Sequence, residues 1–93
     1  VTIGHNAVVH ACTIEDGVTI GMGAIIMDGA RIRKHSIVGA GCVVTAEKDF
    51  PENSLILGLP ARFVRELTFE EIQNNLKNAK SYVELIQKEK NNV

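Results

Sequence analysis

The residues best suited to chemistry are His5 and His10, two of the three histidines, which lie five residues apart in a stretch that otherwise predicts strand. Zinc binds imidazole nitrogen, and a catalytic zinc site usually combines three protein ligands with a water molecule. Extended chain spans up to ~3.3 Å per residue, so these two side chains would not easily meet at one metal within a single chain. A neighbouring subunit could bring its own copy alongside, with a third ligand from elsewhere. Two surface or hydrogen-bonded histidines are the alternative, and His35 is interpreted as a solvated residue.

A repeat of six residues contains this histidine pair. Large aliphatic residues recur at steps of six, except for one step of five between Val9 and Ile14, and glycine follows at Gly4, Gly21 and Gly39. A mostly smaller residue stands two positions before each aliphatic one. The aliphatic residues are Ile3, Val9, Ile14, Ile20, Ile26, Ile32, Val38 and Val44, and the smaller ones are Val1, Ala7, Cys12, Val18, Ala24, Ala30, Ser36 and Cys42.

Such a repeat predicts a solenoid. A strand points alternate side chains to opposite faces, so three short strands with a turn after each close a triangular coil of about eighteen residues. The large aliphatic residue then fills the interior, the smaller one sits near the corner, and glycine relieves backbone crowding. A β-sandwich would instead show turn signals every 8–12 residues or so. We therefore predict a mainly β fold, a parallel β-helix over residues 1–46.

The coil length predicts what surrounds the histidines. One coil of eighteen residues, less the short step, places Met22 above His5. The same count places Met27 above His10. Both histidines should point outward, and the methionines either line one side of the histidine region or belong to a contact between subunits.

The remainder of the chain closes the solenoid. Residues 47–67 carry both prolines and predict an irregular return segment. Residues 68–90 predict an amphipathic helix that packs on the coils, because Thr68 and Glu71 are spaced as a capping box. Its apolar stripe consists of Ile72, Leu76, Ala79, Val83 and Ile86.

Composition excludes several classes of partner. The 93 residues carry a net charge of -1, which does not favour binding to nucleic acid or to an anionic membrane. No apolar run approaches the ~20 residues that span a bilayer. Cys12 and Cys42 occupy small-residue positions of the repeat, which favours reduced thiols and a cytoplasmic location. The chain begins at Val1, in the middle of the pattern, and we expect a processed or truncated N-terminus.

Several blocks of sequence resemble the gamma-class carbonic anhydrases. They are Val1-Thr-Ile-Gly-His-Asn-Ala-Val-Val-His-Ala-Cys-Thr-Ile, Ile20-Gly-Met-Gly-Ala, Val38-Gly-Ala-Gly, Gly58-Leu-Pro-Ala and the helix that bears Tyr82. The resemblance covers essentially the whole chain. It implies a left-handed β-helix, a homotrimer, and zinc or another divalent metal such as iron or cobalt at each subunit interface. The implied activity is reversible hydration of carbon dioxide to bicarbonate by a metal-bound hydroxide.

The resemblance also assigns residues. His5 and His10 match the second and third metal histidines of the family, one given to each neighbouring site, and Tyr82 resembles the helix tyrosine that approaches the metal. The first metal ligand, and the asparagine, glutamine and arginine–aspartate pair around it, lie upstream in the family, where this chain has no residues. The N-terminal coils are therefore expected to be missing, and activity requires them.

Two other functions are open. Hexapeptide acyl- or acetyltransferases share the coils, bind acyl-CoA between subunits and use a histidine as general base. A non-catalytic binding or assembly module is the second alternative, because fold does not determine function.

Overall fold

The computed structural model describes residues 1–75 of the chain. They form ten strands followed by the first turns of a helix, residues 69–75. The strands are β1 (Thr2–Ile3), β2 (Val8–Val9), β3 (Thr13–Ile14), β4 (Thr19–Ile20), β5 (Ile25–Ile26), β6 (Arg31–Ile32), β7 (Ile37–Val38), β8 (Val43–Val44), β9 (Ser54–Gly58) and β10 (Ala61–Glu66).

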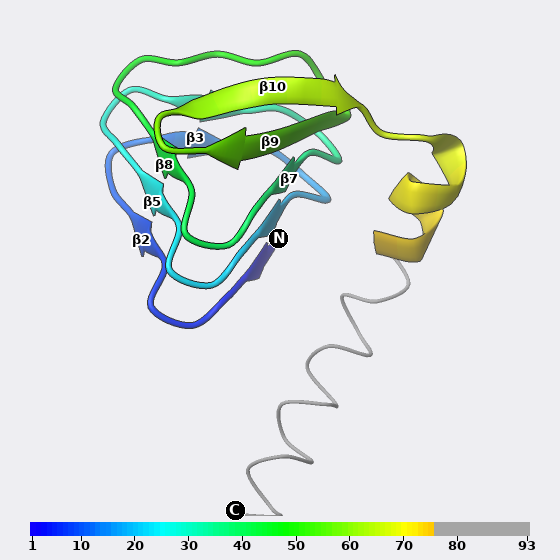
Figure 1. Ribbon diagram of the computed structural model, residues 1–93, viewed down its shortest axis with the longest axis horizontal. Helices are drawn as coiled ribbons and strands as arrows, with labels where there is room; N and C mark the ends of the chain where they lie inside the picture. The colour runs from blue at the N-terminus through cyan, green and yellow to red at the C-terminus, as the bar shows by residue number, and fades with distance from the viewer. Residues whose placement is uncertain (76–93) are drawn as a thin grey trace, which may run out of the picture.

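The first eight strands wind into triangular coils that stack on one another (Figure 1). Face A consists of β1, β4, β7, β9 and β10, face B of β2, β5 and β8, and face C of β3 and β6. All pairs among β1–β8 are parallel. The structure thus confirms the parallel β-helix predicted from the six-residue repeat.

The strand register contains the short step seen in the sequence. Val9 of β2 pairs with Ile26, seventeen residues later, whereas Thr13 of β3 pairs with Arg31, eighteen residues later. The first coil therefore lacks one residue at the corner between faces B and C. Every later pair keeps the spacing of eighteen, for example Ile20 with Val38.

The coil interior is formed by the two residue series that the repeat predicts. Because each middle coil is covered on both sides, its inward residues are almost completely buried. Ile3, in the first coil, is 50% exposed, since a coil contacts it on one side only. The residues that are at most 1% exposed are Val18, Ile20, Ala24, Ile26, Ala30, Ile32, Ser36, Val38, Cys42, Val44, Ser54 and Ile56.

The corners are built from residues with left-handed backbone. One such residue occurs at each corner of each coil, and equivalent residues stack in three columns. His35 stands in one column, where a side chain on Gly17 would come within 2.5 Å of its Nδ1 atom. The columns are Asn6, Gly23 and Gly41; Ala11, Gly29 and Glu47; and Gly17, His35 and Asn53.

Placement in this column corrects the interpretation of His35 as a solvated residue. The side chain is half-buried, and its Nδ1 atom has no hydrogen-bond partner within residues 1–75. The cause is the stacking of corners, which places the imidazole against Gly17 of the coil below.

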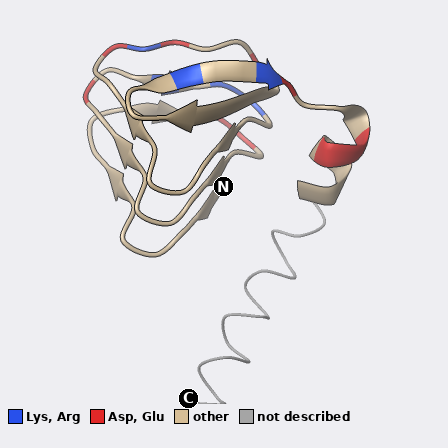
Figure 2. Ribbon diagram, viewed as in Figure 1, with Lys and Arg blue, Asp and Glu red and all other residues tan. Residues whose placement is uncertain are grey.

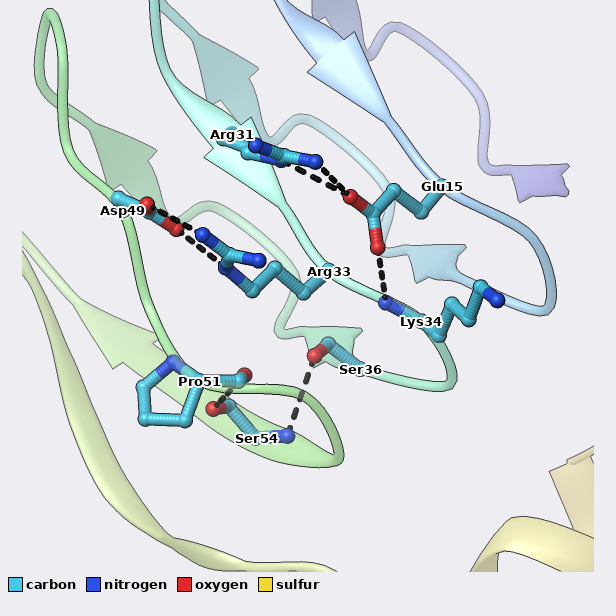
Figure 3. Close-up of polar contacts among 8 residues, drawn as sticks. All are labelled: Glu15, Arg31, Arg33, Lys34, Ser36, Asp49, Pro51 and Ser54. Carbon is cyan, nitrogen blue, oxygen red and sulfur yellow. Dashed lines mark hydrogen bonds and ion pairs between the residues drawn. The ribbon is translucent and has the colours of Figure 1, made fainter.

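The segment after the repeat is more regular than expected. Residues 47–67, predicted as an irregular return, contain β9 and β10, which form an antiparallel hairpin. Strand β9 continues face A because it pairs in parallel with β7 and buries Ile56 in the core. The buried hydroxyl of Ser54 is satisfied because it donates to the carbonyl of Pro51, and the Ser54 amide donates to Ser36 Oγ (Figure 3).

The helix begins with the predicted capping box. The Glu71 amide donates to Thr68 Oγ1 over 3.1 Å, and the Thr68 amide donates to Glu71 Oε1 over 3.0 Å. The helix lies beside face A, because Thr19 Oγ1 donates to Asn75 Oδ1 and Asn75 Nδ2 donates to the carbonyl of Gly17. The rest of the predicted helix, including Tyr82, lies outside the described residues. Among the residues described, no helix is long and apolar enough to cross a membrane.

Candidate metal centre

The two predicted ligand residues lie at opposite borders of face B. His5 follows β1 at the corner between faces A and B, and its carbonyl accepts a hydrogen bond from the Gly23 amide over 2.8 Å. His10 follows β2 directly, at the corner between faces B and C. Both side chains are exposed, as the phase of the repeat predicts. One chain therefore keeps its two imidazoles apart, with the width of a face between them.

His10 is held by a carboxylate from the next coil. Its Nδ1 atom lies 2.9 Å from Oδ1 of Asp28. The His10 and Asp28 side chains are 77% and 70% exposed, so the pair stands on the surface. A carboxylate accepts hydrogen bonds and does not donate them, so Nδ1–H is the donor in this contact. In the neutral ring Nε2 then keeps its lone pair.

Face B itself is apolar on its outer side. Val8, Ile25 and Val43 stack in register along it, and the first two are exposed. Met22 and Met27, in the coil above the histidines, are also exposed. Figure 2 shows β2, β5 and β8 without charged residues. This face joins the two histidine corners with a continuous uncharged surface.

Face C has the opposite character. Arg33 forms two hydrogen bonds with Asp49, at 2.8 and 2.9 Å, and Arg31 pairs with Glu15 at 2.7 Å (Figure 3). These hydrogen bonds lower the pKa of both carboxyl groups, through Arg33 for Asp49 and through Arg31 for Glu15. These two pairs thus compensate their charges on face C, with the Glu15 side chain only 16% exposed. The strands of face B, β2, β5 and β8, carry no charged residue.

No complete metal site lies within the described part of one chain. Residues 1–75 contain no group of three histidine, cysteine, aspartate or glutamate side chains that could hold a metal ion. Cys12 and Cys42 are free, and burial raises the pKa of both thiols. They are poor ligands in that state, because metals bind the thiolate.

Comparison with known proteins adds to this geometry. Residues 11–46 match the family of bacterial transferase hexapeptide proteins (six repeats). The mitochondrial gamma carbonic anhydrase 2 of Arabidopsis thaliana is 45% identical over 87 residues, which are 94% of this chain and 31% of the relative. A probable carbonic anhydrase of Methanocaldococcus jannaschii is 54% identical over 85 residues, which are 91% of this chain and 54% of the relative. The crystal structure of a Bacillus cereus protein, provisionally named an acetyltransferase, is similar with a TM-score of 0.84 and 40% identity, over 99% of this chain and 54% of that one.

This chain contains the repeats of the hexapeptide family and is similar in sequence, over most of its length, to gamma carbonic anhydrases. It spans 31% of the plant relative and 54% of the archaeal one. The transferase neighbours share its fold, so these similarities alone do not choose between the two chemistries.

Sequence reasoning missed one residue of the candidate site, namely Asp28. A signal was available in the single step of five between Val9 and Ile14. A shortened corner leaves one residue of the coil above without a counterpart, and Asp28 is that residue.

Proposed function

We propose that the chain is part of a gamma-type carbonic anhydrase-like metalloprotein that hydrates carbon dioxide reversibly. In this proposal, His5 and His10 bind a divalent metal ion, most simply zinc, at the interface between two copies of the chain. The observation that carries the proposal is the position of two exposed imidazoles at the two borders of an uncharged, apolar face. The relatives named as carbonic anhydrases support the reaction class.

A homotrimer would unite the two histidines. If three copies turn face B toward a common axis, the corner between faces A and B of one copy meets the corner between faces B and C of the next. His5 of one chain then lies near His10 of its neighbour. The apolar residues of face B favour this contact, because burial of apolar surface drives association, whereas the ion pairs of face C are stable in water as they are. A third ligand would come from coils upstream of Val1.

The donors suit the metal chemistry. Neutral imidazole is a common ligand of zinc, and zinc sites of catalytic type keep one position open for water. When bound, zinc acts as a Lewis acid and lowers the pKa of a coordinated water molecule to about 7. His5 and His10 hold the ion and do not transfer protons in this scheme. Met22 and Met27 limit water beside the site, and Tyr82 is proposed to approach the metal from the helix.

Metal analysis tests the proposal. Protein that includes any upstream coils is purified as wild type, as His10→Ala and as His35→Gln, a control histidine at a different corner. We expect about one ion per chain in wild type and in the control, in a protein whose mass is that of a trimer, and loss of the ion in His10→Ala. Wild type and the control should then hydrate carbon dioxide. A trimer that holds no metal under any loading condition would refute this function.

Acyl transfer is the second candidate function, because solved hexapeptide transferases share the fold. In that case one histidine acts as general base and an acyl-CoA binds between subunits. Titration with coenzyme A separates the two candidates: binding that needs His10 but no metal favours acyl transfer. A protein that binds neither metal nor coenzyme A would fit a non-catalytic assembly module.

The compartment is a separate proposal. Two reduced cysteines suit the cytoplasm, whereas the plant relative is named as mitochondrial. Both are reducing environments, so the cysteines do not distinguish them.

A further inference from the structure

We propose that Asp28 is a positioning residue that holds the His10 imidazole with Nε2 free and directed outward. The proposal rests on the proposed function, in which His10 is a metal ligand. Its basis is the 2.9 Å contact between His10 Nδ1 and Asp28 Oδ1. Since the carboxylate can only accept, this contact selects the tautomer with a proton on Nδ1 and fixes the rotation of the ring.

The backbone explains why Asp28 reaches His10. Met27 stacks over His10 by continuation of the β2–β5 register. Gly29, two residues after Met27, donates its amide to the carbonyl of Ala11, one residue after His10, over 2.8 Å. Asp28 lies between these two rungs and has no counterpart in the coil below, because that coil is one residue shorter.

The same residue is anchored from the other side. The amide of Glu47, in the third coil, donates to the carbonyl of Asp28 over 3.0 Å. The main chain of Asp28 is therefore held by the third coil, while its carboxylate reaches His10 in the first coil. This contact between coils forms at the shortened corner.

The contact fits a role in orientation better than a role in stability. Ion pairs between side chains this exposed contribute little to folding. Histidine ligands, by contrast, usually donate their second ring N–H to a carboxylate or carbonyl, and removal of that partner commonly weakens metal binding about 10–100-fold. No other carboxylate is hydrogen-bonded to either candidate ligand within residues 1–75.

Two measurements test the proposal, one of them without metal. Nitrogen-15 NMR of the metal-free protein at about pH 8, where an ordinary imidazole is neutral, reports which ring nitrogen of His10 carries the proton. We expect the Nδ1–H form in wild type and a shift toward the Nε2–H form in Asp28→Ala, with His5 unchanged as internal reference. A purely structural role of Asp28 would not change this ring signal.

The second measurement is zinc affinity by competition with a chelator. Asp28→Ala should weaken zinc binding about 10–100-fold, and Asp28→Asn should recover part of the loss, because the amide oxygen can still accept from Nδ1. The matched control is Asp16→Ala, which removes the same charge at the corner between faces C and A, and it should change affinity less than about twofold, as expected for a screened distant charge.

The outcomes separate this proposal from the proposed function. If His10→Ala abolishes zinc binding but Asp28→Ala changes neither the affinity nor the tautomer, the role of Asp28 is refuted and the metal site stands. If wild type binds no zinc, the proposed function fails, and the NMR result alone decides the pairing: an Nε2–H ring in wild type contradicts it, and an Nδ1–H ring that Asp28→Ala abolishes supports it.

Discussion

Two glycines two residues apart should respond very differently to alanine, because they serve the corner in different ways. A Cβ atom on Gly21 would lie 2.5 Å from the Ala40 amide nitrogen and 2.7 Å from the Gly39 carbonyl carbon, both in the next coil. A Cβ atom on Gly23 would meet nothing within 4 Å, but Gly23 has a φ of 70°. The first substitution is therefore a test of coil spacing, and the second is a test of backbone strain alone.

The expected loss of folding stability in Gly21→Ala follows from these distances. Ordinary contact begins at 3.4 Å, so Gly21→Ala would push the next coil away by 0.9 Å at the amide nitrogen (3.4 minus 2.5). That shift breaks the 2.8 Å bond from the Gly21 amide to Val38 and the 2.8 Å bond from the Gly41 amide to Met22, at about 1 kcal/mol each. Residual strain adds about 1–3 kcal/mol. After about 0.4–1 kcal/mol is regained from the unfolded state, a net loss of about 3 kcal/mol remains.

Gly23→Ala should lose less folding stability than Gly21→Ala. Left-handed backbone disfavours alanine by about 1–2 kcal/mol, and the same gain of about 0.4–1 kcal/mol from the unfolded state offsets part of it. We expect Gly23→Ala to lose about 1 kcal/mol or less. Urea unfolding followed by far-ultraviolet circular dichroism, at one fixed protein concentration because assembly would shift the midpoint, gives both values. A loss for Gly23→Ala equal to or larger than that for Gly21→Ala would refute the account of coil spacing.

Three further predictions concern the helix cap, a strained corner and face B. The hydrogen bonds from Arg65, and then the one from the Thr68 amide, lower the pKa of Glu71 from 4.5 to about 2. Wild type should therefore be more stable than Glu71→Gln above pH 4.5, and this difference should vanish as the pH falls toward 2. Urea titrations at several pH values measure it. Ala11→Gly should stabilise by about 0.5–1 kcal/mol because Ala11 has a φ of 49°, whereas Ala40→Gly, which relieves no left-handed strain, should destabilise by a similar amount. Ile25→Asp should shift a trimer toward monomers in sedimentation analysis, and Thr13→Asp on face C should not; an unchanged mass for Ile25→Asp would remove face B as the interface.

The sequence was sufficient to predict the coils because their periodicity is strict. Each inward position is filled by one aliphatic side chain per face, so counting alone places Ile20 between Ile3 and Val38. Residues 47–67 were misjudged although the step continues there: Phe50 and Ile56 follow Val44 at intervals of six, and β9 pairs with β7 at the spacing of eighteen. Both prolines lie in this segment and suggested an irregular return instead. His35 was misjudged for a related reason: its neighbours in sequence are charged, but its surroundings are set by Gly17 in the coil below.

At the candidate site, the direction of the histidines could be predicted from the sequence, but the hydrogen-bond partner of His10 could not. The phase of the repeat was enough to predict that His5 and His10 point outward, because phase is a local property of the chain. The partner of His10 depends on register between coils, and one deleted residue changes that register. Asp28 is eighteen residues from His10, which is the length of a normal coil and suggests that Asp28 lies directly above His10. Because Val9 pairs with Ile26, only seventeen residues later, Met27 lies above His10 and Asp28 lies one position beyond it. A shortened coil is therefore a useful place to search for side chains that cross between coils, since the coil above it carries a residue without a counterpart, here Asp28.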